Sequence, residues 1–130
     1  MIWNWSPNMG VNNLFFDEEI STSAKEKLLC SLEAIPFFAD GINNEMWKSK
    51  KYGVIISFDA KITTKLVGIE IWKNLFYKNN LLIGLKENEI KEIFYFIDDW
   101  QLDENGDFIQ SYELDALFWM ENGMVESVSL

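Results

Sequence analysis

Hydrophobic and polar positions alternate in the stretch YGVIISFDAKITTKLVGIEIW, first over residues 54–58 and again over residues 66–72. A period of two places alternate side chains on the same face of an extended strand. Two such runs joined by a short polar segment predict a β-hairpin with one buried face. The apolar positions that alternate are Val54, Ile56, Phe58, Val67, Ile69 and Ile71.

Three shorter stretches also indicate strands. The opening IWNW predicts a strand followed by a turn at Ser6-Pro7-Asn8, and residues 14–16 predict a second short apolar strand. NLFYKNNLLIG predicts a tight strand pair that turns at Lys78-Asn79-Asn80. The C-terminal YELDALFWMENGMVESVSL predicts a closing hairpin, because its Glu121-Asn122-Gly123 turn contains the Asn-Gly step that two-residue hairpin turns favour.

Two segments have helical periodicity instead. Residues 24–34 carry leucines at helical spacing, and Ser23 and Glu26 have the S-x-x-E spacing of a capping box. Pro36 is expected to end this helix. Residues 87–97 predict a second helix with one apolar face. The apolar positions of the two helices are Leu28, Leu29, Leu32, Ile90, Ile93, Phe94 and Ile97.

These elements predict an α+β fold with a single, mostly antiparallel sheet packed by two helices. With 130 residues, 48% of them hydrophobic, the chain is long enough for one globular domain spanning residues 1–130. Residues 14–28 and 81–93 each show an apolar strand, an acidic turn and a helix. This weak echo suggests an internal duplication.

Composition places the chain in a reducing, aqueous compartment. Cys30 is the only cysteine, so no intramolecular disulfide can form. Because it falls within the leucine stripe of the first helix, Cys30 is expected to be a small hydrophobic filler. The N-terminus lacks the basic and apolar regions of a secretory signal, and no apolar run is long enough to span a membrane. We therefore expect a cytoplasmic protein without membrane contact.

The negative charge is concentrated in the last third of the chain. Residues 1–91 hold all 11 lysines and 11 acids, whereas residues 92–130 hold the other 10 acids and no lysine, which gives the net charge of −10. The absence of histidine and arginine removes the usual general base and the guanidinium fork that binds phosphate. Direct nucleic-acid binding is therefore not expected, because the phosphate backbone requires the opposite charge.

The stretch DDWQLDENGD, residues 98–107, is the most acidic segment and the first place to look for chemistry. As an EF-hand loop with Gly106 at position six, it would lack the carboxylate at position one and the glutamate at position twelve. Acids adjacent in sequence diverge on a strand or a helix, so they rarely converge on one substrate. With no glycine-rich loop and no base for Cys30, we expect no catalytic, metal or cofactor site and no enzyme activity.

Two tryptophans in this acidic third indicate a different role. Trp100 and Trp119 lie among acids in a segment without cations, and aromatic anchors surrounded by charge are common at protein interfaces. This predicts a surface that receives a basic protein, although a merely solvated acidic surface is the alternative. The predicted partner-binding residues are Asp98, Asp99, Trp100, Asp103, Glu104, Asp107, Tyr112, Glu113, Trp119 and Glu121.

Three stretches resemble the small acidic immunity proteins of bacterial contact-dependent growth inhibition and polymorphic toxin systems. They are WNWSPNMGVNNLFFDEEISTSAKEKLL, KLVGIEIWKNLFYKNNLLIGLKENEIKEI and LDALFWMENGMVESVSL, about half of the chain. The resemblance implies a non-catalytic inhibitor that binds one cognate toxin domain. Many such toxins are nucleases with positively charged substrate-binding surfaces, which an acidic protein complements. The alternative is an acidic inhibitor or DNA mimic that acts on a host nucleic-acid enzyme.

Overall fold

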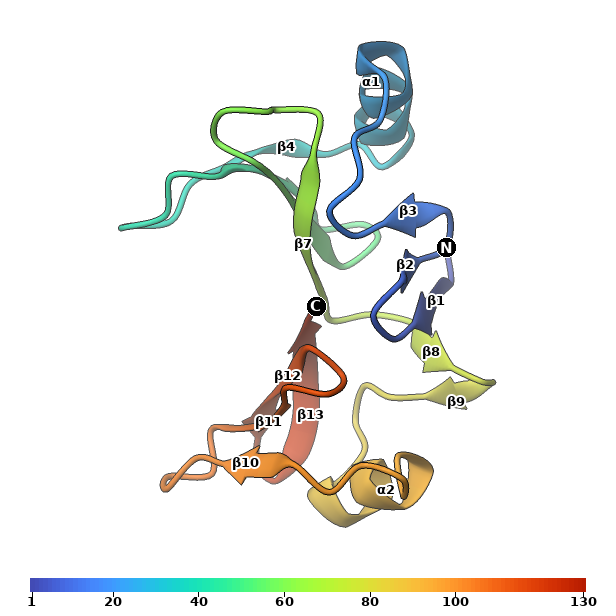
Figure 1. The fold of residues 1–130 in the computed structure, drawn as a ribbon, viewed down its shortest axis with the longest axis vertical. Coiled ribbons are helices and arrows are strands. Elements are labelled where there is room, and N and C mark those ends of the chain that lie inside the picture. The colour runs from blue at the N-terminus through green and yellow to red at the C-terminus, as the bar shows by residue number, and fades with distance from the viewer.

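The computed structural model describes all 130 residues as an α+β fold with two helices and two sheets (Figure 1). The larger sheet contains β4 (Ile35–Phe37), β5 (Glu45–Ser49), β6 (Val54–Phe58), β7 (Leu66–Ile71), β10 (Trp100–Leu102), β11 (Phe108–Ser111), β12 (Ala116–Glu121) and β13 (Met124–Ser129). The smaller sheet contains β1 (Trp3–Ser6), β2 (Gly10–Val11), β3 (Leu14–Phe15), β8 (Leu75–Tyr77) and β9 (Asn80–Leu81). The strand orders are β10-β11-β12-β13-β7-β6-β5-β4 and β3-β2-β1-β8-β9.

The α+β class, the two helices and the mostly antiparallel strands are confirmed, but the predicted single sheet is wrong. The free edge of β7 is taken by β13, so the next strand in sequence cannot pair there. Asn74, in the left-handed conformation with φ 53°, turns the chain away from the larger sheet. β8 then pairs in parallel with β1, with Trp3 opposite Leu75. This parallel pair forms the centre of the second sheet.

Three predicted hairpins are present: β6–β7, β8–β9 and β12–β13. The turn residues explain two of them. Lys78 and Asn79 have φ values of 44° and 66°, and Asn122 and Gly123 have φ values of 54° and 76°. Two consecutive left-handed residues match the right-handed twist of the flanking strands, which is why such two-residue turns close hairpins.

Both helices are shorter than predicted. Helix α1 (Thr22–Ser31) begins at Ser21, whose Oγ accepts a hydrogen bond from the backbone N–H of Ala24, so the predicted capping box at Ser23 is wrong. Helix α2 (Glu87–Ile93) ends before Phe94, because φ −99° and ψ 47° take that residue out of helical conformation. Cys30 is exposed on α1, so it does not fill the core as expected.

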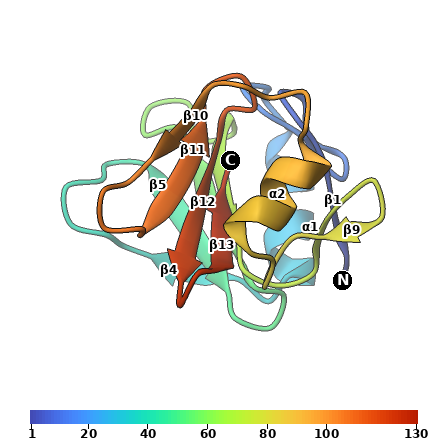
Figure 2. The same cartoon turned by 90° about the horizontal axis from the view of Figure 1, so that it is seen from below.

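The core lies between one face of the larger sheet and a layer made of both helices and the smaller sheet. Figures 1 and 2 show α1, α2, β1 and β9 on the same side of β7 and β13. Trp5, Phe94 and Phe118 are buried together here, with ring centroids between 5.6 and 6.1 Å apart. The opposite face of the larger sheet carries no helix, and we call it the open face.

The two halves of the chain repeat the same order of elements. Each half begins with short strands, continues with one helix and ends with a four-stranded antiparallel meander, either β4 to β7 or β10 to β13. The turns inside the meanders match in detail. The buried Ser49 Oγ accepts from the N–H of Tyr52 at 3.3 Å, and the buried Ser111 Oγ accepts from the N–H of Leu114 at 3.0 Å.

Matching β-bulges extend this repeat to the last hairpin of each half. Val67 is the extra residue between β6 and β7, and Glu126 is the extra residue between β12 and β13. Glu70 and Ser129 are each the third residue after the bulge, and they face one another where β7 pairs antiparallel with β13. The halves are thus related by an approximate two-fold axis that passes between Glu70 and Ser129.

Neither helix has the length and apolar character needed to cross a membrane.

Candidate partner-binding surface

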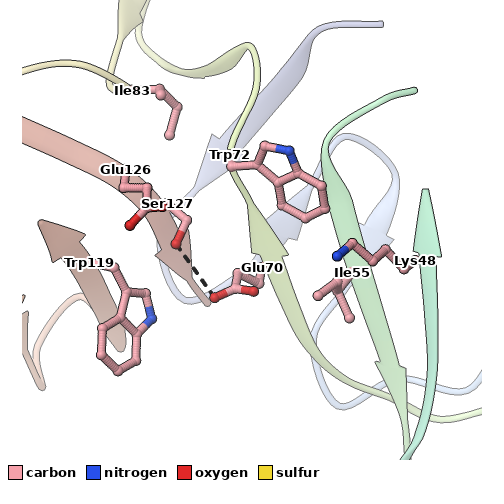
Figure 3. Close-up of a pocket in the computed structure, with 8 residues that line it drawn as sticks. All are labelled: Lys48, Ile55, Glu70, Trp72, Ile83, Trp119, Glu126 and Ser127. Carbon is pink, nitrogen blue, oxygen red and sulfur yellow. Dashed lines mark hydrogen bonds between the residues drawn. The ribbon is translucent and has the colours of Figure 1, made fainter. Parts of the chain in front are cut away.

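A groove on the open face lies across the β7–β13 junction (Figure 3). Because side chains alternate between the faces of a strand, Glu70 and Ser129 point to this face while Ile71 and Val128 enter the core. The groove has a volume of about 700 Å³. It is lined by Lys48, Ile55, Glu70, Trp72, Ile83, Trp119, Glu126 and Ser127.

A short polar chain crosses the groove. The indole Nε1–H of Trp119 donates to Ser129 Oγ at 3.0 Å. The hydroxyls of Ser129 and Ser127 donate to Glu70 Oε1 at 3.4 and 3.5 Å, which are long distances for O–H···O bonds. Trp119 is 37% exposed and is the only tryptophan among the exposed large hydrophobic residues. The indole is therefore held in place and still accessible.

Glu70 is half-buried and has no counter-ion within the chain. The ion pairs of the protein use other acids: Lys25 pairs with Glu45, Lys51 with Glu33 and Lys91 with Glu87. Lys48, at the far side of the groove, places its Nζ 5.1 Å from the centroid of Phe37 and 5.5 Å from that of Trp72. Glu126, the other acid of the groove, has no ion pair either, and Glu70 is the carboxylate that lies between the two indoles.

The ten residues predicted from the sequence do not form one cluster. The strand register places the β10–β11 and β12–β13 turns at one end of the second meander and the β11–β12 turn at the other end. At the first end lie Asp103, Glu104, Asp107 and Glu121, near Trp119. At the second end lie Asp98, Asp99, Trp100, Tyr112 and Glu113.

Two of the predicted acids have structural roles. Asp99 accepts hydrogen bonds from Ser111 Oγ at 2.7 Å and from the backbone N–H of Glu113 at 2.8 Å. Asp103 accepts from the backbone N–H groups of Asn105 and Asp107 at 3.3 and 3.1 Å, which closes the β10–β11 turn. These carboxylates shape the turns, whereas Asp98, Glu104, Asp107, Glu113 and Glu121 are exposed.

The three predicted aromatic residues also differ. Trp100 is half-buried and packs with its ring centroid 6.0 Å from that of Phe118, at the margin of the core. Tyr112 is 69% exposed at the tip of the β11–β12 turn. Trp119 alone combines exposure with a groove, and its ring meets Phe108 edge to face at 5.6 Å. Of the three, Trp119 is the best placed to anchor a partner.

The hydrogen bonds to Asp99 give a pH-dependent contribution to stability. The Ser111 hydroxyl, followed by the Glu113 N–H, lowers the pKa of Asp99 from its ordinary value. Stabilisation by a carboxylate with a lowered pKa is present above the pKa of an unfolded Asp, about 3.9, and is lost as the pH falls through the folded value. We expect Asp99→Asn to lower the melting temperature at neutral pH and to have little effect below that window.

Melting curves across a pH series check this expectation, with the exposed neighbour Asp98→Asn as the matched control. A loss for Asp99→Asn that is equally large at every pH would contradict the role of the charge.

Sequence reasoning did not identify Glu70, Trp72 or Lys48 as site residues. A signal for Glu70 was present, since it is the one acid in the apolar run VGIEIW and its side chain alternates with those of Ile69 and Ile71.

No group of three or more His, Cys, Asp or Glu side chains is arranged to hold a metal ion. Comparison with protein-family models, with curated protein sequences and with solved structures finds no match.

Proposed function

We propose that this protein is a non-catalytic immunity protein, which binds a basic cognate toxin domain through the open face of the second meander and neutralises it. The observation that carries this proposal is the position of Trp119. This exposed indole lies beside the groove and next to the turns that hold Asp103, Glu104, Asp107 and Glu121. An accessible aromatic anchor with an acidic margin is a common arrangement at interfaces with basic proteins.

The mechanism follows from the two kinds of residue. Exposed acids raise the rate at which a positively charged surface is encountered, because their field extends roughly 8–10 Å at physiological salt. The buried part of the contact, around Trp119, then limits dissociation. A nuclease toxin binds its substrate through positive charge, so the acidic protein would cover the surface that nucleic acid needs.

A second candidate is an acidic inhibitor or DNA mimic that acts on a host nucleic-acid enzyme. The division of the acids between two ends of the second meander favours this alternative, because a mimic needs negative charge at intervals along a face. The two candidates differ in their partner, which is either a dedicated toxin or a general nucleic-acid enzyme.

Co-expression with the protein encoded by the neighbouring upstream gene tests the proposal. We expect the two proteins to co-purify as a stable complex, and we expect the present protein to restore growth of cells that express the toxin domain. A neighbouring protein that is not toxic, or toxicity that persists without complex formation, would contradict the immunity function. Inhibition of a host nuclease or polymerase instead would support the second candidate.

A further inference from the structure

We propose that the groove across the β7–β13 junction receives an arginine side chain of the partner, with Glu70 as the counter-ion and the indoles of Trp72 and Trp119 on either side. The inference rests on the proposed function and specifies the contact that anchors it. The predicted acidic residues would then steer the partner, whereas Glu70 would fix its position.

The state of Glu70 is the first argument. Its carboxylate is half-buried and accepts only two long hydrogen bonds, at 3.4 and 3.5 Å, from neutral serine hydroxyls. A partly desolvated carboxylate gains most from a cationic donor, because charge-assisted hydrogen bonds are shorter and stronger than neutral ones. No cation of the chain lies within ion-pair distance of this carboxylate. The groove therefore leaves room for a cation from outside.

The aromatic residues are the second argument. The ring of Trp119 is held by its hydrogen bond to Ser129, and the backbone of Trp72 is fixed by the bond from its N–H to the carbonyl of Gly53 at 2.9 Å. Figure 3 shows Glu70 between the two indoles. A cation over an indole face is attracted by the electrons of the ring. The planar guanidinium both stacks on indoles and pairs with a carboxylate through two N–H groups, so arginine fits better than lysine.

Size and charge complementarity are the third argument. A volume of about 700 Å³ lies within the range of sites that take a small ligand, so one side chain and the adjoining backbone can enter. Two acids, Glu70 and Glu126, line the groove against one cation, Lys48. Lys48 is already placed over the rings of Phe37 and Trp72. The net charge of the lining thus favours a basic occupant.

The test uses the full-length protein and short peptides, so it does not require the natural partner. The peptide acetyl-Gly-Gly-Arg-Gly-Gly-amide is titrated into isotope-labelled protein, and the indole N–H signal of Trp119 is followed by NMR. Matched peptides carry lysine or citrulline at the central position, and citrulline keeps the shape of arginine without its charge. We expect a saturable, millimolar shift with the arginine peptide, a weaker one with lysine and none with citrulline.

Three variants locate the site. Glu70→Gln should weaken binding of the arginine peptide about tenfold, the loss expected for one charge-assisted contact. Trp72→Leu should also weaken it, because one aromatic face is lost while the Trp119 signal remains. Glu92→Gln makes the same charge change at an exposed position on α2, on the other side of the sheet, and should bind normally.

Unchanged binding by Glu70→Gln, equal binding of the citrulline peptide, or no saturable shift at Trp119 would overturn the inference. These results are independent of the co-purification experiment. Peptide binding without a toxin partner would contradict the immunity function and leave the groove established. A toxin complex whose affinity does not change with Glu70→Gln would support the immunity function and contradict the proposed role of the groove.

Discussion

Replacing Phe118 by alanine should lower the free energy of unfolding by about 3–5 kcal/mol, the usual loss for a large aromatic side chain in a core. Phe118 is fully buried at the centre of β12. Its ring lies 6.1 Å from those of Trp5 and Phe94 and 6.0 Å from that of Trp100, so it joins the larger sheet to β1 and to Phe94, the residue at the C-terminal cap of α2. The cavity left by its removal would border all three elements.

Urea denaturation followed by circular dichroism measures this loss, which is a large part of the roughly 5–15 kcal/mol that stabilises a typical domain. Phe38→Ala is the matched control. Phe38 is 87% exposed on the loop between β4 and β5, and its removal should change stability by less than about 0.5 kcal/mol. Similar losses for the two variants would show that the Phe118 cluster is not the core.

Neutralising the exposed acids of the β10–β11 and β12–β13 turns should slow association with a basic partner about tenfold or more at low salt. The variant is Glu104→Gln, Asp107→Asn and Glu121→Gln together. Asp99 and Asp103 are left intact, because their carboxylates hold turns and their loss would mix folding with binding. The difference from the native protein should shrink as salt rises, since screening removes the steering field.

Stopped-flow association rates over a salt series measure this effect. The control variant carries Glu18→Gln, Glu26→Gln and Asp40→Asn, three exposed positions in the first half of the chain. It changes the net charge by the same amount and should associate with the basic partner faster than the variant of the turn acids does. If both triple variants associate equally fast at every salt concentration, the turn acids form only a solvated surface, and the alternative interpretation of the acidic third holds.

The sequence was informative wherever a local signal was sufficient. The β6–β7 alternation and the paired turn residues at Lys78-Asn79 and Asn122-Gly123 identified hairpins, because the turn type depends on nearby residues alone. The strands β2, β4, β5, β10 and β11 were missed. Pro36 suggested a helix end, yet proline is tolerated in β4 because this strand lies at an edge of the sheet. The acids around β10 concealed a strand of only three residues.

The candidate site was harder to predict because it depends on pairing between distant segments. Counting acids along the chain grouped Asp99 with Asp103, but the strand between them carries the two residues to opposite ends of the meander. The groove exists only because β13 pairs with β7, and neither strand shows this in its own pattern. The alternation of side chains within β7 indicates the sheet face to which Glu70 points. The pairing of β7 with β13 determines which residues lie next to Glu70 on that face.

The approximate two-fold axis between Glu70 and Ser129 has a consequence for the orientation of any ligand in the groove. A perfectly symmetric site would accept an elongated ligand equally well in both directions. Here the backbone repeats but the side chains do not. Next to Glu70, the row of paired residues across the sheet continues with Ile55 and then Lys48. Next to Ser129, the same row continues with Leu117 and then Gln110. Only the end of the row at Lys48 carries a cation, so the proposed basic ligand would be expected to bind in one preferred direction, with its positive charge away from Lys48.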